Sequence, residues 1–517
     1  MINKTSENNK RIAKNSIFMT IRMIVVMFLT FYTTRVVLSR LGVVDFGVYN
    51  VVCGFVAMFA FMNTSMSNGI QRFFNFEYAK NGEGGANKVF ITAVQIQVIL
   101  AIILVCIVEI AGYWYLNNKM VIPDDRFIAA NWIFQFSILN FVFVILEAPF
   151  AAAITAHERM DFYALVGVLD AILKLFIAFS LDNILGDNLI IYGLLLALIS
   201  VLDFLLYFIY SKYHFKEIRF SWCFDKDLFK SMLVFSGWNF FGAFSGVMKE
   251  QGINLVINLF FGPIVNAARG VATQINSGLQ SFVANVTTPV RPQVIQSYAQ
   301  GNITRTLNLT FSISKLSCVC QYMMALPLIY EVDFVLGIWL EGEIPEHTSS
   351  FIIIIIATSF LNNLNSAVSA VIHASGKMKK YQVLTSITAM MCIPLAYVVL
   401  IRGASPEWAL IMVTLTMLFA QIVSVLILGT VIELSFLTYL TKIIWPLAMI
   451  IIATIWIPLI ITSIMVEGWW RLIVNIIISV IAICFFYYHL ALEQNEKELI
   501  DNILLSKLKM KNHKSQN

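Results

Sequence analysis

The sequence predicts an all-α integral membrane protein with about 14 transmembrane helices, arranged as two parallel six-helix lobes followed by two C-terminal helices. Three observations support this: the apolar composition, the placement of Lys and Arg, and an internal repeat. Of the 517 residues, 59% are hydrophobic and only 13% are charged, and the mean hydropathy is +0.80. Soluble proteins are about a quarter charged, and a helix needs about 20 apolar residues to cross a bilayer. The chain is therefore expected to cross a membrane many times.

Fourteen apolar runs, separated by polar breaks, are long enough to be spans. They lie near 16–39, 46–69, 88–116, 127–149, 160–182, 188–211, 230–260, 264–290, 306–330, 348–374, 381–402, 406–431, 438–466 and 469–492. The N-terminal stretch MINKTSENNKRIAKNS is polar and basic and leads directly into the first run. This arrangement indicates an uncleaved first span rather than a signal peptide.

The positive charges give the predicted orientation. Of the 35 Lys and Arg residues, 24 fall in segments assigned to the cytoplasm and five on the opposite side. Cytoplasmic loops carry such an excess, so both termini are predicted to be cytoplasmic. The basic tail at 493–517 is expected to lie along the membrane surface. No segment between spans is long enough for a catalytic domain, so the chain is not expected to be an enzyme.

Similar short sequences recur at offsets of 218 to 220 residues. ITAHERMDFY at 154–163 resembles IHASGKMKKY at 372–381, and further matches pair Gly42 with Gly262, Arg72 with Arg291, and Tyr78-Ala79 with Tyr298-Ala299. The alternative is chance similarity between low-diversity membrane segments. Parallel repeats are typical of transporters, whose substrate lies between two lobes. The predicted parts are therefore 1–215 (spans 1–6), 216–432 (spans 7–12) and 433–492 (spans 13 and 14).

Charged residues inside the predicted spans are candidates for a functional site. The basic ones are Arg22, Arg35, Lys174, Lys249, Arg269 and Lys315, and the acidic ones include Glu109, Asp170, Asp203 and Glu250. Such groups normally face a hydrated cavity or a partner, although Arg22 and Lys315 are near helix ends and can snorkel. Lys174 follows Asp170 by one turn, so the two can pair. Lys249 and Glu250 point about 100° apart on a helix, and we expect them not to pair.

Span 8 carries a polar stripe. Its members recur at three- and four-residue steps: Asn266, Arg269, Thr273, Asn276, Ser277 and Gln280. Hydrogen-bonded packing between helices is one explanation for such a stripe. The arginine favours a hydrated path for an anionic or hydroxyl-rich substrate, because its planar fork suits phosphate oxygens.

Several segments together resemble the polysaccharide-biosynthesis (O-antigen flippase) branch of the multidrug/oligosaccharidyl-lipid/polysaccharide (MOP) exporter superfamily. They are RLGVVDFGVYNVV at 40–52, QRFFNFEYAKNG at 71–82, FSGWNFFG at 235–242, FFGPIVNAARGVATQI at 260–275 and RPQVIQSYAQGN at 291–302. The resemblance extends over almost the whole chain. The count of twelve plus two spans is similar to the lipid II flippase arrangement, in which the extra helices help to form a groove for the lipid tail.

This resemblance implies a flippase that moves undecaprenyl-pyrophosphate-linked oligosaccharides (O-antigen, capsule or other surface polysaccharide) across the bacterial cytoplasmic (inner) membrane by alternating access. The implied partners are this lipid-linked substrate, membrane lipids and other polysaccharide-assembly proteins, without nucleic acid, metal or cofactor. The substrate-binding candidates are Arg35, Lys174, Lys249, Arg269, Asn266, Thr273, Asn276 and Gln280. Arg269 is the candidate for the pyrophosphate, and Asp170, Asp203 and Glu250 are candidates for ion coupling.

Other functions fit the sequence less well. A cation-coupled multidrug antiporter of the same fold is the main alternative, but it needs membrane acids early in the chain, and span 1 has two arginines and no acid. A membrane polymerase or ligase would need a large outer loop. Cys318 and Cys320 have no further ligands nearby for a metal, and the six His residues are scattered. A nucleotide-binding P-loop motif is absent from the sequence.

Overall fold

The computed structural model describes residues 2–498, except 158, 182–183, 220–223, 288–293, 295–296, 299, 341–343, 376–377 and 495. The described residues are helices and short connections, without a strand. Arg291, Lys377 and the tail beyond Glu498, which the sequence analysis used, lie outside the described residues. The chain forms two compact units. Unit 1 comprises Met1–Gly278, Leu336–Ile355 and Gln382–Met417, and unit 2 comprises Leu279–Val335, Ile356–Tyr381 and Leu418–Asn517.

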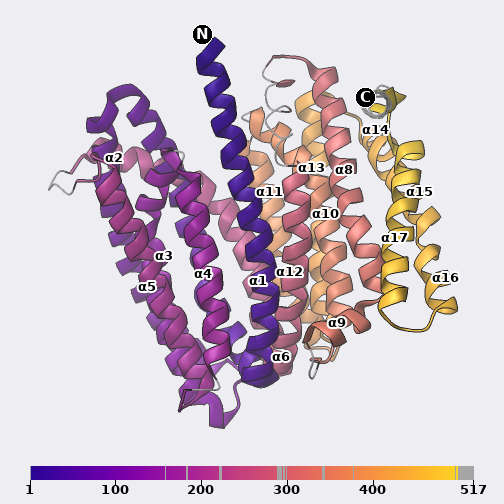
Figure 1. Ribbon diagram of the computed structural model, residues 1–517, viewed down its shortest axis with the longest axis horizontal. Coiled ribbons are helices and arrows are strands. Elements are labelled where there is room, and N and C mark those ends of the chain that lie inside the picture. Colours follow the sequence, from indigo (N-terminus) through magenta and orange to yellow (C-terminus); the bar gives the residue numbers. More distant parts are fainter. Residues whose placement is uncertain are drawn as a thin grey trace, which may run out of the picture. The chain divides into compact units, whose positions relative to one another are not determined.

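The helices follow one another along the chain as Figure 1 labels them. The first group is α1 Ile2–Ala57, α2 Ala60–Asn118, α3 Phe127–Ala156, α4 Met160–Ser180, α5 Asn188–His214 and α6 Lys226–Thr287, with a 3-10 turn at Asp124–Arg126. Next come α8 Ile303–Tyr330, α9 Val332–Leu340, α10 Thr348–Ala374, α11 Met378–Met390, α12 Cys392–Leu400 and α13 Glu407–Ile432. The last are α14 Phe436–Tyr439, α15 Trp445–Thr454, α16 Trp456–Ile464 and α17 Trp469–Phe486, with π-helical turns at Leu440–Ile444 and Tyr487–Ala491.

Twelve helices in the described part of the chain are long and apolar enough to cross a membrane. The chain is thus a multi-pass membrane protein, but the expected count of 14 is not confirmed. The difference arises because α1 and α6 each contain two of the predicted spans. Each of these helices continues through a glycine with non-helical geometry. Gly42 has φ 78° and ψ 169°, and Gly262 has φ 74° and ψ −168°. Positive φ values are accessible mainly to glycine.

Gly42 and Gly262 are also partners in the predicted repeat. Their nearly equal backbone angles at corresponding positions support a duplication. The proposed lobes, 1–215 and 216–432, remain a prediction, because the compact units group residues by contact and α6, α10 and α13 contribute to both units.

Three predicted spans are interrupted. Span 2, predicted at 46–69, is divided by a turn at Met58 and Phe59. Span 11 is divided between α11 and α12, and span 13 between α15 and α16. In the latter two cases a proline, Pro394 or Pro458, is the third residue of the new helix. A proline lacks the amide hydrogen and its ring clashes with the carbonyl four residues earlier, which explains both breaks.

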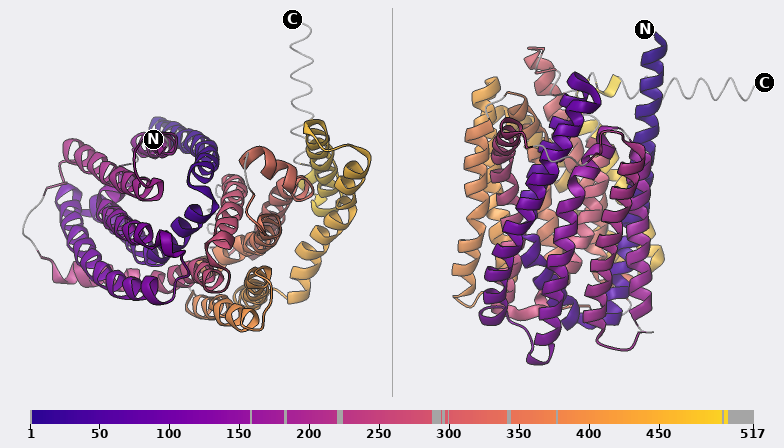
Figure 2. Two further views of the ribbon diagram at one scale, coloured as in Figure 1. Left: turned by 90° about the horizontal axis from the view of Figure 1, so that it is seen from below. Right: turned by 90° about the vertical axis from the view of Figure 1, so that its left-hand side faces the viewer.

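Within unit 1, α3 packs against α2 and α5, and α1 packs against α4. Figure 2 shows these helices end-on in its left view. Two buried clusters hold them together, one around Val48, Leu104 and Phe134 and one around Phe74, Phe90 and Phe150. The helices therefore form a packed scaffold on which side chains within the membrane are positioned.

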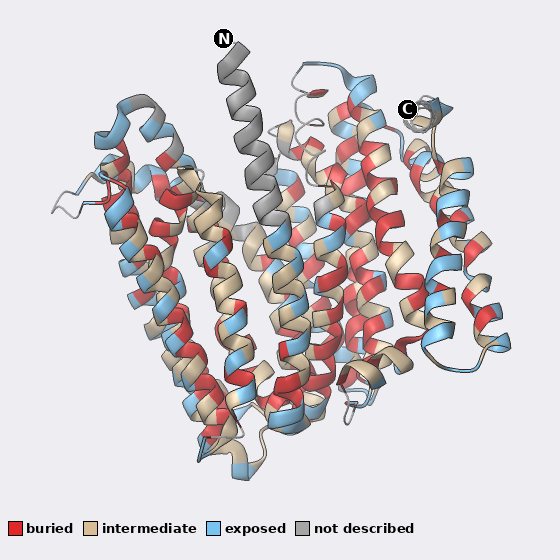
Figure 3. Cartoon of the chain, in the orientation of Figure 1, coloured by how far each residue is buried: buried red, intermediate tan, exposed pale blue. Residues whose placement is uncertain are grey.

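Within unit 2, α17 and the π-helical turn that follows it are anchored to α8 near both ends of α17. At one end Arg471 Nη2 donates to Glu331 at 2.6 Å, and Asn475 donates to the same carboxylate. At the other end the Lys315 ammonium donates to the carbonyl of Ala491. Lys315 is therefore buried in an anchor and does not snorkel. Figure 3 shows that α8 is largely buried, whereas α17 carries many exposed residues.

Candidate functional site

A cluster of three charged side chains from α6 is the first candidate site, and all three belong to unit 1. Lys249 Nζ lies 3.4 Å from Glu250 Oε1, and Arg269 Nη2 lies 3.3 Å from Glu250 Oε2. Arg269 Nη2 also donates to the backbone carbonyl of Glu250 at 2.7 Å. The Gly262 break folds α6 back on itself, which is why residues 19 positions apart meet.

The prediction that Lys249 and Glu250 would not pair is wrong. Adjacent helical residues do leave the backbone about 100° apart. However, both side chains are long and flexible, so their charged ends can still approach one another. The direction of the Cα–Cβ bond fixes where such a side chain begins, but not where its charged end lies.

The α6 cluster has an excess of positive charge. The two cationic side chains are nearly buried, with exposures of 10% for Lys249 and 9% for Arg269, and they share one carboxylate that is 54% exposed. Arg269 Nε is buried without a hydrogen-bond partner among the described residues. A buried charge in a membrane protein requires compensation. The cluster is therefore suited to bind an additional anionic group through its unused donor.

The polar stripe on α6 divides into two kinds of residue. Asn266 donates to Asn254, at 2.9 Å to its carbonyl and 2.6 Å to its side chain, and Thr273 donates to the carbonyl of Gly270 at 2.8 Å. These two side chains support packing within α6. In contrast, Asn276 Oδ1 and Gln280 Nε2 are buried without a partner in the described structure. Asn266 Oδ1 is likewise buried without a partner among the described residues, so unused polar atoms recur along the whole stripe.

The remaining predicted cations lie on other helices. Lys174 Nζ forms the expected pair with Asp170 on α4, at 2.8 Å. On α1, the Arg35 guanidinium carbon is 5.7 Å from the centre of the Tyr32 ring. The structure thus joins only Lys249 and Arg269 of the four predicted cavity cations.

A second cluster of titratable side chains joins α3, α4 and α5 of unit 1, and it contains more carboxyl groups than basic side chains. Asp203 lies beside Asp170, and Glu147 interacts with both carboxylates. Lys174 offsets part of this charge, but Asp203 Oδ1 is buried without a partner among the described residues. The three carboxyl groups, only one of which is paired with Lys174, make a site at which a proton can be taken up.

Glu147 was missed by the sequence analysis. It occurs in the apolar run FVFVILEAPF, two residues before Pro149, and an acid inside an apolar run was the signal that could have identified it. Among the described residues, no group of three or more His, Cys, Asp or Glu side chains is arranged to hold a metal ion.

Arg22 lies beside the second cluster, so snorkelling does not describe it. Its guanidinium carbon is 4.6 Å from the centre of the Tyr163 ring. It also packs on Gly167, where an added Cβ would lie 2.3 Å from Arg22 Nε. Tyr207 lies within electrostatic range of Arg22, Glu147 and Asp203. Because Gly167 has no side chain, the Arg22 guanidinium has room to lie next to the acidic cluster.

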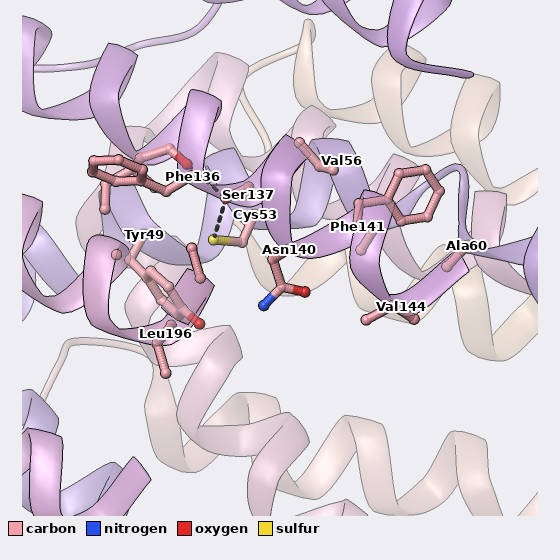
Figure 4. A pocket seen from close by; sticks show the side chains of 14 residues that line it. Tyr49, Cys53, Val56, Ala60, Phe136, Ser137, Asn140, Phe141, Val144 and Leu196 are labelled. Carbon is pink, nitrogen blue, oxygen red and sulfur yellow. Dashed lines mark hydrogen bonds between the residues drawn. The ribbon is translucent and has the colours of Figure 1, made fainter. Parts of the chain in front are cut away.

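An apolar pocket of about 290 Å³ lies between α1, α3 and α5 in unit 1. Figure 4 shows Tyr49, Ser137 and Asn140 among its mostly apolar lining, with Ser137 Oγ 3.1 Å from Cys53 Sγ. No charged side chain belongs to its lining. This pocket is suited to an apolar chain and not to an anionic head group.

No protein-family model and no curated protein matches the sequence. Solved structures do match the fold. A lipid II flippase MurJ in an inward closed conformation has a TM-score of 0.70 at 13% identity, covering 92% of this chain and 98% of that chain. An inward-facing multidrug resistance MATE family transporter of the MOP superfamily has a TM-score of 0.63 at 14% identity, covering 81% and 98%. A MOP superfamily transporter from Pyrococcus furiosus, described as having a binding pocket of reverse polarity that suggests a different function, has a TM-score of 0.57 at 16% identity, covering 81% and 96%.

The chain therefore has the transporter fold of the MOP superfamily. The expected all-helical membrane fold is confirmed, and the resemblance seen in the sequence agrees with the structural neighbours. The neighbours with this fold include a flippase and multidrug transporters, so the fold is common to more than one transport function.

Proposed function

We propose that the protein is a flippase that moves pyrophosphate-linked oligosaccharide lipids across the bacterial cytoplasmic membrane, with both termini in the cytoplasm. The observation that carries this proposal is the excess positive charge of the α6 cluster, where Lys249 and Arg269 share the single carboxylate of Glu250. A lipid pyrophosphate brings the negative charge that this cluster lacks. The lipid II flippase among the structural neighbours supports a cargo of this class.

The cluster suggests how the head group is held. The phosphates take hydrogen bonds from Arg269, whose Nε is unused, and displace part of the ion pair with Glu250. Arginine binds phosphate through parallel N–H donors. Because Glu250 is half exposed, its carboxylate can turn away without being left in apolar surroundings. The polyprenyl tail remains in lipid while the two lobes alternate, and no covalent step is needed.

A cation-coupled multidrug antiporter is the second candidate. The acidic cluster of Glu147, Asp170 and Asp203 favours it, because a cationic drug or a coupling proton needs carboxylates within the membrane. The MATE transporters among the structural neighbours are consistent with it. In the flippase, the same cluster supplies the coupling site, so the two functions differ in what the α6 cluster binds.

Deleting the gene in its native host tests the proposal. A membrane-impermeant glycan probe, applied to spheroplasts and to inverted vesicles, reports on which leaflet lipid-linked oligosaccharide accumulates. Accumulation on the cytoplasmic leaflet, with loss of surface polysaccharide, is expected for the flippase. An unchanged lipid-linked pool with intact surface glycan would contradict it and favour the antiporter. Re-expression of the wild-type chain and of Arg269→Ala is the matched control.

A further inference from the structure

Unit 2 contains a pocket whose chemistry differs from both charged clusters. It has a volume of about 380 Å³ and lies between the last turns of α6 and the second half of α10. The lining residues are mostly amides and hydroxyls: Gln280, Val283, Ala284, Thr287, Asn362, Asn363, Asn365, Ser366 and Ser369. None of them carries a charge. We refer to it as the amide pocket.

Two buried polar atoms of the amide pocket have no hydrogen-bond partner among the residues that the structure describes. They are Gln280 Nε2 on α6 and Asn365 Oδ1 on α10. Buried polar groups are almost always hydrogen-bonded, so each exception needs a partner such as water or a ligand. The Gln280 atom is a hydrogen-bond donor and the Asn365 atom is an acceptor. Their occupant must therefore both accept and donate hydrogen bonds, as a hydroxyl group does.

Other polar groups of the pocket are fixed in place by neighbours within unit 2. Asn365 Nδ2 donates to the Tyr381 hydroxyl at 2.8 Å, and Asn363 Nδ2 donates to Gln321 Oε1 at 2.6 Å. These bonds orient the amides before any ligand arrives. Preorganised amides lose little entropy on binding, which distinguishes a built site from a loose polar surface.

We propose that the amide pocket binds an uncharged sugar ring of the cargo. The volume is within the range of small-molecule pockets, roughly 300–1,000 Å³. Neutral amides and hydroxyls match the alternating donors and acceptors of a sugar, and no lining residue can neutralise an anionic group. The inference rests on the proposed function, since the sugar ring that it assigns to this pocket belongs to the proposed cargo.

The position of the pocket suggests its use. Gln280 and Thr287 lie toward the end of α6, and Ser369 lies toward the end of α10, at ends that the Lys and Arg distribution predicts to be cytoplasmic. A sugar that enters from the cytoplasmic leaflet meets this end of unit 2. The pocket thus selects among head groups by their uncharged ring.

The test measures binding of two matched phosphate-free probes to the full-length protein in nanodiscs by saturation-transfer NMR. Methyl glucoside is uncharged, and methyl glucuronide has the same ring with a carboxylate. The wild-type protein is expected to bind the glucoside about tenfold more tightly than the glucuronide, and Gln280→Met and Asn362→Leu are each expected to weaken glucoside binding about tenfold, as a lost hydrogen bond predicts. Asn308→Leu, at an exposed position on α8 outside the pocket, is the control and should bind like wild type.

Thermal unfolding separates loss of the site from loss of the fold. Gln280→Met removes a buried amide donor that lacks a partner, so its unfolding temperature should equal or exceed that of wild type. Absence of glucoside binding to wild type would show a water-filled cavity and overturn the inference. Equal binding by the pocket variants, or equally tight glucuronide binding, would also overturn it. Flipping of the lipid-linked substrate is measured separately, so the flippase proposal can survive any of these results.

Discussion

The two clusters of unit 1 both hold titratable side chains within the membrane, but one is rich in basic groups and the other in acidic groups. The α6 cluster places two cations around one carboxylate, whereas the cluster of α3, α4 and α5 gathers three carboxyl groups, of which Asp170 is paired with Lys174. Taking a charge out of water is costly, and a partner compensates only part of the cost. The α6 cluster is therefore left with a positive charge that an anion from outside can balance, and the second cluster with carboxyl groups that can take up or release a proton. We infer that one cluster binds the anionic cargo and the other the coupling cation.

The largest expected effect comes from Arg269→Ala. Losing one partner of a buried, hydrogen-bonded charge pair costs about 2–5 kcal/mol, so flipping should slow by about thirtyfold or more. The measurement is the rate at which a pyrophosphate-linked oligosaccharide reaches the opposite leaflet of proteoliposomes. Arg269→Lys keeps the charge but loses the planar fork and should be intermediate. Normal flipping by Arg269→Ala would exclude the α6 cluster as the phosphate site.

Removing an acid from the second cluster should affect coupling instead of binding. A gradient of one pH unit corresponds to about 1.4 kcal/mol per proton, or a factor of about ten in accumulation. Glu147→Gln is expected to abolish this factor and to leave the gradient-free rate unchanged. Proteoliposomes with and without an imposed gradient provide the comparison. Glu109→Gln, which removes an acid from α2 outside this cluster, is the matched control. If Glu147→Gln also stops gradient-free flipping, the two clusters do not have separate roles.

A smaller effect is expected from Glu250→Gln. This variant removes the carboxylate that competes with the cargo for Lys249 and Arg269. Because Glu250 is 54% exposed, solvent screens the interaction, and a gain of about 1 kcal/mol, or roughly fivefold tighter binding of undecaprenyl pyrophosphate, is expected. Isothermal titration calorimetry measures it. Weaker binding would show that the main effect of Glu250 is to orient Lys249 and Arg269, and not to compete with the cargo for them.

The smallest change tests the place of Arg22 beside the acidic cluster. In Gly167→Ala the new methyl group would lie 2.3 Å from Arg22 Nε, so the arginine must shift. Because the atoms it meets are the far end of a flexible side chain, the cost should stay below the roughly 1 kcal/mol at which overpacking usually begins, and the unfolding temperature should fall slightly. Gly237→Ala on α6 is the control, since nothing lies within 4 Å of its added Cβ. Equal unfolding temperatures for the two variants would mean that Arg22 moves aside freely.

The sequence predicted the membrane fold well, because spans depend on local composition. Runs of about 20 apolar residues and the placement of Lys and Arg are properties of each segment alone. It predicted the breaks less well. The glycine at 42 and the prolines at 394 and 458 were visible, but whether a helix bends or ends at such residues depends on what packs against it.

The charged sites were predicted only in part. Lys174 and Asp170 pair as expected, because their separation of one turn fixes their geometry. Lys249 and Glu250 pair against expectation, because the ends of long side chains are not fixed by helical direction. The acidic cluster was invisible as a unit, since Glu147, Asp170 and Asp203 come from three helices. The amide pocket likewise needs α6 and α10 to meet.

The anchoring of α17 to α8 has a mechanical consequence. The two anchor points on α8, Lys315 and Glu331, are about 24 Å apart at the usual rise per residue. With a single contact, α17 could rotate about that point relative to α8. Two contacts this far apart prevent such a rotation, so α8 and α17 must tilt together. The C-terminal helices therefore move with α8, and small rotations of α8 become larger displacements of these helices at the lipid boundary. A fluorescent or spin label at exposed Ile481 on α17 would read out those rotations from outside the transport path.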